Sequence, residues 1–320
     1  MSNLVLELRN VSKVFATHTA VDNVSLAVER GELHALLGPS GCGKTTTLRM
    51  VAGFETPTHG EILLGGHDIA QLKPYERNVS TVFQSYALFP HLTVRENIEF
   101  GLRQQGSANR KQKIDDALEL VQLEHRANHK PPQMSGGEKQ RAALARSLVL
   151  APEVLLLDEP LSALDPNLRK QVRAELKALQ RRVGITFLMV THDQEEALSL
   201  SDHITLMNKG RVEQVGTPEE IYLKPRTAFT ASFLGAMNWV DGVGIRPECT
   251  FVALEQPGNG ARSRAAVVKH STFLGDCLHV EAEMPGGASL VAQVSRLNGR
   301  YHAGQAVHVW WHPHDELHLK

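Results

Sequence analysis

A glycine-rich segment, Gly38–Thr45, constrains the fold of this chain more than any other feature. It has the pattern G-x-x-x-x-G-K-[ST], which binds phosphate when it joins a strand to a helix. The apolar run Leu33–Leu37 before it predicts a buried strand, and Thr46–Ala52 after it predicts the first turns of a helix. An α/β domain with a phosphate site at a helix N-terminus is therefore expected.

The residue types in this loop suit phosphate binding. Glycines let backbone N–H groups converge on phosphate oxygens, and the helix N-terminus adds a partial positive charge. Lys44 is expected to reach the β- and γ-phosphates, and the Thr45 hydroxyl to contact Mg²⁺. A glycine-rich turn without a ligand is the alternative, which the strand–helix context disfavours. The expected nucleotide ligands here are Gly38, Pro39, Ser40, Gly41, Cys42, Gly43, Lys44, Thr45 and Thr46.

Composition excludes several classes of protein. The 320 residues suggest about two domains, and a formal net charge of −1 lacks the basic excess of a nucleic-acid-binding surface. Three well-separated cysteines, Cys42, Cys249 and Cys277, indicate a reducing compartment rather than a disulfide framework. Neither a signal peptide nor an apolar run of about 18 residues is found, so no membrane span is expected.

Polar residues follow two further apolar strands. Val154–Glu159 ends in two carboxylates, and the run Ile185–Val190 is followed closely by His192. The carboxyl ends of parallel strands form the ligand-binding edge of an open α/β sheet. We expect Asp158 to hold Mg²⁺ and Glu159 to orient and deprotonate water. His192 is expected to reach a γ-phosphate, and a hydrogen-bonded loop histidine is the alternative.

Three loop segments allow two interpretations each. Phe15 is either a core residue or a platform for a purine ring. The apolar residues after Gln84, from Ser85 to Leu92, form either a surface for a partner or a small satellite of the core. Cys42 is either a reactive thiol at a helix N-terminus, where alkylation blocks activity and nucleotide protects, or a small residue that fills the loop.

Helix signals occur between and after the strands. Ala108–His125 carries apolar residues at helical spacing. Asp165 followed by Pro166 predicts a helix start, and Gly184 predicts its end. Ser135 and Glu138 have the spacing of a capping box, followed by a helix over Lys139–Leu150. Because the glycines between them gain nothing as helix formers, a close backbone approach to an anion is the second interpretation.

The order of these motifs resembles the ATP-binding subunit of the ABC transporter superfamily, over about residues 4–235. The resemblance implies a P-loop NTPase fold with a helical subdomain at about residues 86–150, ATP and Mg²⁺ as ligands, and Lys44, Glu159 and His192 as catalytic residues. The corresponding motifs are the Walker A loop (Gly38–Thr45), the Q-loop (Gln84), the signature (Met134–Glu138), the Walker B strand (Val154–Glu159), the D-loop (Ser162–Asp165) and the switch histidine (His192).

Two motifs depart from the usual family pattern. The signature has Met134 and Glu138 in place of Leu and Gln, and the glutamate adds a negative charge near a phosphate site. Phe15 takes the place of the stacking tyrosine. The resemblance implies that Phe15, Gln84 and the residues Ser135, Gly136, Gly137 and Glu138 contact nucleotide. It also implies that Thr45, Gln84 and Asp158 contact the metal.

The resemblance also implies partners. Two copies are expected to close around two ATP molecules, each held between the Walker A loop of one copy and Ser135–Glu138 of the other. Residues 83–92 resemble the surface of importer ATPases that takes a coupling helix of a membrane permease. A homodimer is therefore expected at the cytoplasmic face of the inner membrane, as a peripheral subunit, with a solute-binding protein as an indirect partner and no nucleic acid.

The C-terminal residues change to short strands, expected at Cys249–Leu254, Arg264–His270, Cys277–Glu283, Ser289–Val294 and Ala306–Trp311. They predict a small all-β, OB-like barrel over residues 236–320, after an ATP-binding domain over residues 1–235. Gly244–Glu248 resembles the entry to a TOBE domain. Four clustered histidines are interpreted as surface rather than a metal site: His308, His312, His314 and His318.

The solute is expected from resemblance alone, because the ATPase does not contact it. Segments 233–239 and 310–313 resemble 2-aminoethylphosphonate importer subunits, with polyamine or ferric-iron importers as the alternatives. An alternative of another class is a soluble ABC ATPase without a transport role. Such proteins usually carry two cassettes or long coiled-coil insertions, and neither is found here.

Overall fold

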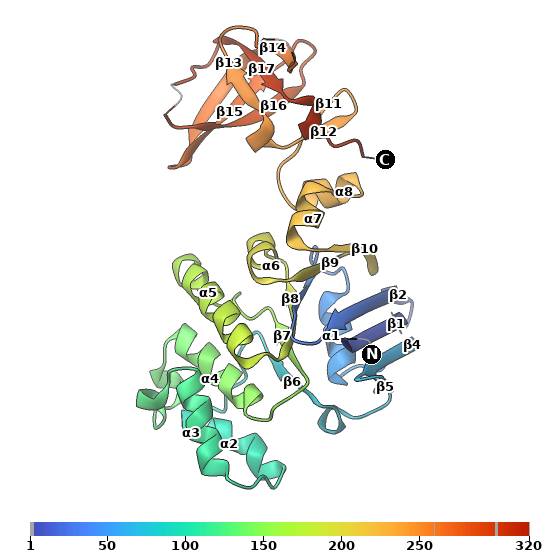
Figure 1. Cartoon of the computed structure of the whole chain (residues 1–320), viewed down its shortest axis with the longest axis vertical. Helices are drawn as coiled ribbons and strands as arrows, with labels where there is room; N and C mark the ends of the chain where they lie inside the picture. Colours follow the sequence, from blue (N-terminus) through green and yellow to red (C-terminus); the bar gives the residue numbers. More distant parts are fainter. Residues whose placement is uncertain (1–2, 259, 298–299, 320) are drawn as a thin grey trace. The chain divides into compact units, whose positions relative to one another are not determined.

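A computed structural model describes residues 3–258, 260–297 and 300–319 (Figure 1). Contacts between residues divide the chain into two units, Met1–Glu219 and Glu220–Lys320, and each is described by itself. The boundary between these units falls after Glu219. We expected a domain boundary later in the chain, between residues 235 and 236 and after the last α-helix, and that boundary remains a prediction.

The first unit contains two sheets. The smaller one is antiparallel and has the strand order β2-β1-β4-β5. Alternating burial along β1 and β2 shows that one face of this sheet packs on the core. Its strands are β1 (Leu4–Phe15), β2 (His18–Glu29), β4 (His59–Leu64) and β5 (His67–Asp68).

The larger sheet has the order β10-β9-β3-β8-β7-β6, and all neighbours are parallel except β10 and β9. Every residue of β3 and β8 is buried, as expected for central strands of a parallel sheet. The strands are β3 (Leu33–Leu37), β6 (Val79–Val82), β7 (Val154–Asp158), β8 (Thr186–Thr191), β9 (His203–Asn208) and β10 (Arg211–Gly216).

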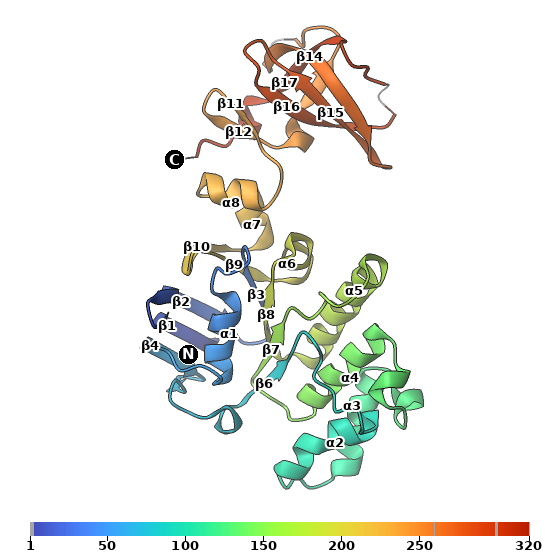
Figure 2. The ribbon, with the colours of Figure 1, turned by 180° about the vertical axis from the view of Figure 1, so that it is seen from behind.

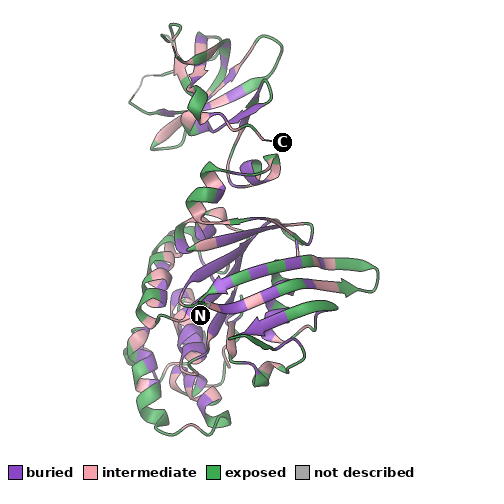
Figure 3. Ribbon diagram, turned by 45° about the vertical axis from the view of Figure 1, so that its right-hand side comes forward, coloured by how far each residue is buried: buried purple, intermediate pink, exposed green. Residues whose placement is uncertain are grey.

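Helix α1 (Lys44–Ala52) lies between the two sheets, as Figures 1 and 2 show from opposite sides. Its apolar residues Leu48, Met50 and Val51 join side chains of both sheets in one core. Figure 3 shows the buried residues gathered on α1 and on the strands around it. The phosphate loop therefore begins at the end of a fully buried strand and leads into a helix that packs on both sheets.

Three helices form a separate core in the helical subdomain: α2 (Val94–Gln104), α3 (Arg110–Leu120) and α4 (Gly136–Leu148). The helix predicted over Ala108–His125 is shorter than expected. It ends at Leu120, because Gln122 adopts a positive φ of 58° and the chain turns into the short 3₁₀ helix η2 (Glu124–Arg126). A second 3₁₀ turn, η3 (Pro131–Gln133), leads into α4.

Two helices follow the Walker B strand, α5 (Pro166–Val183) and α6 (Gln194–Leu200). The start of α5 was predicted correctly: the Asp165 side chain accepts a hydrogen bond of 3.0 Å from the Leu168 N–H, and Pro166 occupies the first turn. Its end was also predicted correctly, since Gly184 has a φ of 64° and caps the helix. A 3₁₀ turn, η1 (Pro74–Glu76), precedes β6.

The second unit contains helix α8 (Ala228–Phe233). Helix α7 (Pro218–Leu223) begins two residues before this unit starts at Glu220. Its antiparallel sheet has the order β13-β17-β14-β15-β16, and the edge strands β13 and β16 approach each other, which supports the expected small barrel. The strands and short turns are β11 (Asn238–Val240), β12 (Val243–Ile245), η4 (Pro247–Cys249), β13 (Phe251–Ala253), β14 (Arg262–Phe273), β15 (Cys277–Glu283), β16 (Ser289–Ser295), β17 (Ala306–Trp311) and η5 (Pro313–Asp315).

The prediction of a strand over Cys249–Leu254 was wrong at its start. Cys249 belongs to a 3₁₀ turn, because Pro247 fixes the backbone there and the Cys249 N–H bonds to the Arg246 carbonyl. The core of this unit includes the fully buried Trp311, whose indole N–H donates to Oε1 of Glu316 at 2.9 Å.

Candidate functional site

The lysine of the phosphate loop is buried inside the loop itself. The Nζ atom of Lys44 donates to the carbonyl oxygens of Gly38 and Pro39 at 2.8 and 2.9 Å, and only 5% of the residue is exposed. The ammonium group is thus enclosed by the loop, where a phosphate would meet it together with the first N–H groups of α1. This arrangement fits a nucleotide phosphate.

Two glycines of the loop lie against backbone that leaves no room for a side chain. A Cβ on Gly38 would lie 2.2 Å from the carbonyl oxygen of Met207, and one on Gly43 would lie 2.5 Å from that of Ala20. Gly43 also has a φ of 100°, which favours glycine. The loop geometry therefore depends on glycine at these positions.

The other predicted loop residues differ in exposure. Thr45 is exposed in the first turn of α1 and Thr46 is half-buried. Ser40 and Gly41 are exposed at the tip of the loop, and Pro39 is half-buried. Cys42 is buried, with Sγ 3.7 Å from Nζ of Lys44. Its burial favours the loop-filling interpretation over the reactive thiol.

Asp158 and Glu159 lie where β7 ends, as predicted. Burial raises the pKa of the Asp158 carboxyl, the charge of Glu159 raises it further, and Arg49 opposes both. A partly buried carboxylate next to a second one is a site that a divalent cation would stabilise. The residues present therefore fit Mg²⁺, although the contacts expected of Thr45, Gln84 and Asp158 with it remain predictions. Among the described residues, no group of three or more His, Cys, Asp or Glu is arranged to hold a metal by itself.

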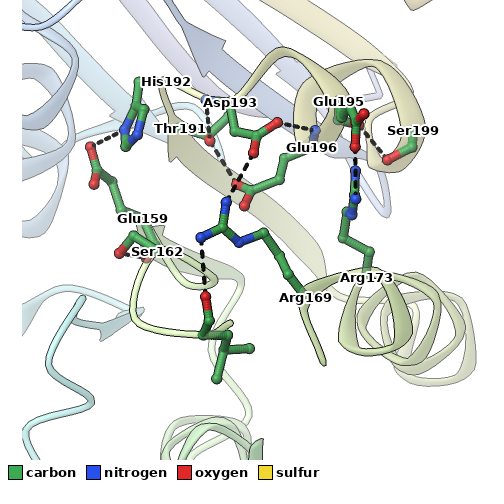
Figure 4. Close-up of polar contacts among 11 residues, drawn as sticks. Glu159, Ser162, Arg169, Arg173, Thr191, His192, Asp193, Glu195, Glu196 and Ser199 are labelled. Carbon is green, nitrogen blue, oxygen red and sulfur yellow. Dashed lines mark hydrogen bonds and ion pairs between the residues drawn. The ribbon is translucent and has the colours of Figure 1, made fainter. Parts of the chain in front are cut away.

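Side chains from three neighbouring loops meet at Glu159. Its Oε1 atom lies 3.0 Å from Nδ1 of His192, and its Oε2 atom accepts from Nε2 of Gln84 at 3.3 Å. These residues follow β7, β8 and β6, which are adjacent and parallel, so their carboxyl ends bring the three side chains together. Figure 4 shows the contact between Glu159 and His192. A carboxylate with these partners has the position expected of a general base.

Ser162 belongs to the same cluster, and the sequence analysis did not select it as a site residue. Its hydroxyl accepts from Nε2 of Gln84 at 3.0 Å and donates to the carbonyl oxygen of Glu159 at 2.9 Å. Its position in the D-loop, Ser162–Asp165, was the only sequence feature that could have marked Ser162 as a site residue. Nearby, Arg169 of α5 bonds to Asp193 at 3.3 Å and to the Leu164 carbonyl at 3.1 Å, which ties the loop after His192 to the D-loop (Figure 4).

The backbone fixes the position of Glu159. Its φ is 46°, and its N–H donates to the carbonyl oxygen of Val190 at 3.0 Å, one residue beyond the end of β7. A non-glycine residue with a positive φ is uncommon and is held by its surroundings. The hydrogen bond to β8 therefore fixes the backbone from which the carboxylate extends.

The signature turn forms the predicted capping box. The Ser135 hydroxyl accepts from the Glu138 N–H at 3.3 Å, and Oε2 of Glu138 accepts from the Ser135 N–H at 2.8 Å. A Cβ on Gly136 would lie 2.9 Å from a methyl carbon of Leu164, so glycine allows close packing on the D-loop, and Gly137 is buried in the next position. In the described part of the chain, no hydrogen bond joins this turn to Lys44 or Glu159, so its contact with nucleotide remains a prediction.

Phe15 is 42% exposed at the end of β1, and Nζ of Lys13 lies 4.8 Å from the centre of its ring. The core interpretation is therefore wrong, because the ring is at the surface. Stacking of a purine on this exposed ring remains a prediction.

The segment over residues 83–92 combines an exposed ring with a strained backbone. Phe83 is exposed, and Phe89 packs on Phe100 with ring centres 4.6 Å apart. Tyr86 and Ala87 both have positive φ angles, and their carbonyl oxygens accept from the guanidinium of Arg146 at 3.0 and 2.7 Å. Arg146 of α4 therefore holds this loop in an otherwise unfavourable conformation.

Comparisons with known proteins agree with this geometry. The family model described as ABC transporter matches residues 21–162, and the model described as TOBE domain matches residues 243–319. The spermidine/putrescine import ATP-binding protein PotA of Bacillus cereus is 45% identical, over 98% of this chain and 99% of the relative. The chain belongs to the ABC transporter family of ATP-binding proteins.

Other members of the ABC family are similar over part of the chain. The PotA protein of Thermobifida fusca is 52% identical over 79% of this chain and 68% of that protein. Among solved structures, cbiO1 of Clostridium perfringens, part of the ABC transporter complex cbiONQ, has a TM-score of 0.64 and 28% identity and covers 69% of this chain and 91% of its own. A dimeric ATP-binding cassette with bound ADP and Pi has a TM-score of 0.59 and 33% identity and covers 67% of this chain and 98% of its own.

These findings establish that this ABC protein binds ATP and hydrolyses it as the ATPase of an importer. The TOBE match confirms the prediction made for the C-terminal strands. In the described residues, no helix is both long and apolar enough to cross a bilayer.

Proposed function

We propose that two copies of this ABC ATPase hydrolyse ATP with Mg²⁺ at two shared sites. In each site the loop Gly38–Thr45 of one copy faces Ser135–Glu138 of the other. The observation that carries the proposal is the meeting of Gln84, Glu159 and His192 at the carboxyl ends of three adjacent strands. The dimeric relative with ADP and Pi supports the participation of two copies.

The roles of the residues follow from their positions. Glu159 takes a proton from the attacking water, which is worth about 10²–10⁴ in rate. His192 holds the Glu159 carboxylate in place and senses the γ-phosphate. Lys44 and the first N–H groups of α1 stabilise the charge of the transferred phosphoryl group. When bound, Mg²⁺ supplies positive charge to the phosphates, and Thr45, Asp158 and Gln84 would hold it.

The solute that we propose is a polyamine. Two relatives named for spermidine and putrescine import are 45% and 52% identical, and one of them matches over 99% of its own length. These names support the polyamine alternative over 2-aminoethylphosphonate, which we had expected first. A match over the full length, including the TOBE region, also favours transport over a soluble ABC ATPase.

The partners follow from the importer role. Residues 83–92, held by Arg146, present the exposed ring of Phe83 and the half-buried ring of Phe89 to a coupling helix of a membrane permease. A solute-binding protein would deliver the polyamine to the permease from the other side. We place the ATPase dimer as a peripheral subunit at the cytoplasmic face of the inner membrane.

The enzyme role is tested with the Glu159→Gln variant. The amide keeps the size of the side chain but cannot accept the water proton, so we expect kcat to fall by about 10²–10⁴ while ATP binding persists. The variant should accumulate as an ATP-bound dimer in size-exclusion chromatography. Full turnover by this variant would show that Glu159 is not the general base.

The solute is tested by uptake. A strain lacking this gene should lose import of radiolabelled spermidine and putrescine, and the wild-type gene should restore it where the Glu159→Gln gene does not. Uptake of 2-aminoethylphosphonate and of ferric iron is measured in the same strains. Loss of either of these, with polyamine import intact, would contradict the polyamine assignment.

A further inference from the structure

The signature turn, Ser135–Glu138, carries a negative charge at a place where phosphate is expected to bind. Glu138 places a carboxylate in the first turn of α4, in the turn that the proposed function brings to the triphosphate of a second copy. A helix N-terminus attracts anions through its free N–H groups and its dipole. An uncompensated carboxylate there would oppose the phosphates.

The structure places a cation on this carboxylate. The Nε atom of Arg126 donates to Oε1 of Glu138 at 2.8 Å, while Oε2 of Glu138 is occupied by the Ser135 N–H. Both carboxylate oxygens therefore have a donor, and only 13% of the Glu138 side chain is exposed. A charge-assisted hydrogen bond of this length at a partly buried site is stronger than an exposed surface pair.

Arg126 is itself held in position. It ends η2, and its Nη1 atom donates to Nε2 of His129 at 3.2 Å. The same segment accepts hydrogen bonds from the start of α2, where the Val94 and Arg95 N–H groups bond to the carbonyl oxygens of His129 and Ala127. The guanidinium is thus attached to the folded helical subdomain rather than to a free loop.

We propose that Arg126 is a positioning residue for the signature turn, because it neutralises Glu138 and keeps the turn attractive to the triphosphate bound by a second copy. In this view Arg126 and Glu138 together replace the neutral glutamine of the usual signature. Arg126 acts through Glu138 and does not contact the nucleotide. The proposal rests on the shared ATP site of the proposed function.

We therefore expect a specific order among the parent protein and three variants in the ATP concentration needed for half-maximal dimerisation. Arg126→Met leaves the charge of Glu138 without its cation, so the ATP concentration for half-maximal dimerisation should rise about tenfold. Glu138→Gln removes the charge itself, so this single variant gives the reference level for a signature turn that needs no cation. The double variant Arg126→Met/Glu138→Gln should return to the level of Glu138→Gln.

The measurement is light scattering of ATP-driven dimers, with every variant made in the Glu159→Gln protein, and kcat and KM are measured separately in the protein with Glu159. Arg126→Lys keeps the charge and should behave like the parent. Arg103→Met is the matched control, because Arg103 pairs with Glu99 at 2.7 Å in the same subdomain but outside the turn. Thermal unfolding of each variant identifies any that fail to fold.

Salt separates charge from packing. Raising the salt from about 0.1 to about 1 M shortens the Debye length from about 10 to about 3 Å. The ratio of the half-maximal ATP concentrations of Arg126→Met and its parent should therefore shrink, whereas a defect of packing would leave the ratio constant.

Each outcome has one meaning. Rescue of Arg126→Met by Glu138→Gln, with a salt-dependent defect, supports the proposal. A folded Arg126→Met that dimerises like its parent overturns it, and so does a double variant as weak as Arg126→Met. If the Glu159→Gln parent itself does not dimerise with ATP, the proposed function fails instead.

Discussion

The Nδ1 atom of His192 lies 3.0 Å from Oε1 of Glu159, and the two residues follow the adjacent parallel strands β8 and β7. The distance is that of a hydrogen bond, so the imidazole determines where the carboxylate points. The Glu159 N–H is bonded to Val190 of the same neighbouring strand, so side chain and backbone are both tied to β8.

The first prediction concerns this pair. In His192→Ala the carboxylate of Glu159 loses its partner, and a base displaced by about 1 Å can lose about 10²-fold in rate. We expect kcat to fall by that order with little change in ATP binding, as measured by single-turnover hydrolysis and nucleotide titration. His270→Ala, which removes an exposed histidine of β14 that lies 3.5 Å from Glu281 of β15, is the control. An unchanged kcat in His192→Ala would show that Glu159 needs no partner.

The second prediction concerns stability and pH. Burial raises the pKa of Asp158 above its ordinary value of 3.8, so the folded protein binds this proton more tightly than the unfolded chain does. Stability is therefore lost as pH rises through the raised pKa, and the loss is fully present at neutral pH. Asp158→Asn should raise Tm at pH 7, because the amide removes the carboxylate charge that burial and Glu159 make unfavourable.

The same variant should lose hydrolysis, because an amide is a weaker ligand for Mg²⁺ than a carboxylate. Thermal unfolding from pH 4 to pH 8 checks the sign, since the gain in Tm should shrink toward pH 4. Mg²⁺ with nucleotide should raise the Tm of the wild type more than that of the variant. A lower Tm for Asp158→Asn at pH 7 would contradict the prediction.

The third prediction concerns the loop that we assign to the permease. Arg146→Met removes the hydrogen bonds to the carbonyl oxygens of Tyr86 and Ala87, whose positive φ angles need external support. We expect polyamine uptake to fall, while hydrolysis by the isolated ATPase changes by less than about twofold, since in the described residues Arg146 has no hydrogen bond to Gln84 or Glu159. Arg95→Met, which breaks the exposed pair with Asp115, is the control. Normal polyamine uptake by Arg146→Met would show that the conformation of this loop is not needed for coupling ATP hydrolysis to the permease.

The fourth prediction concerns Cys42. Only 2% of this residue is exposed, so a maleimide should label it slowly in the folded protein and rapidly after denaturation. Cys42→Ala removes one small sulfur atom and should keep ATP binding within about tenfold. Mass spectrometry of labelled peptides provides the measurement. Fast labelling that ATP prevents would instead support the reactive thiol.

Local signals predicted much of the fold. The glycine loop, the continuous apolar strands and the Asp165 cap each depend on neighbouring residues in the chain, and the structure has them where expected. Helix α2 was missed although Thr93 and Glu96 form a capping box like that of Ser135 and Glu138, so its signal was present. The β9–β10 hairpin was also missed, although its Lys209–Gly210 turn is a typical glycine turn.

The candidate site was predictable in part. Residues with a motif were found, because the chemistry restricts both their type and their spacing. Ser162 and Arg126 were not found, since their roles depend on contacts across the fold with Gln84 and Glu138. A serine or arginine in a short loop has no pattern that distinguishes it, and only the register of neighbouring strands or the packing of a turn reveals its partner.

The hydrogen bond from the Glu159 N–H to Val190 has a consequence for how such a subunit can diversify. The backbone of Glu159 is bonded to the buried sheet, whereas the loop over residues 85–92, beyond the Gln84 contact with Glu159, is supported separately by Arg146. Substitutions that adapt this loop to a different permease can therefore accumulate without moving the carboxylate. One hydrolytic unit can in this way serve transporters of chemically unrelated solutes.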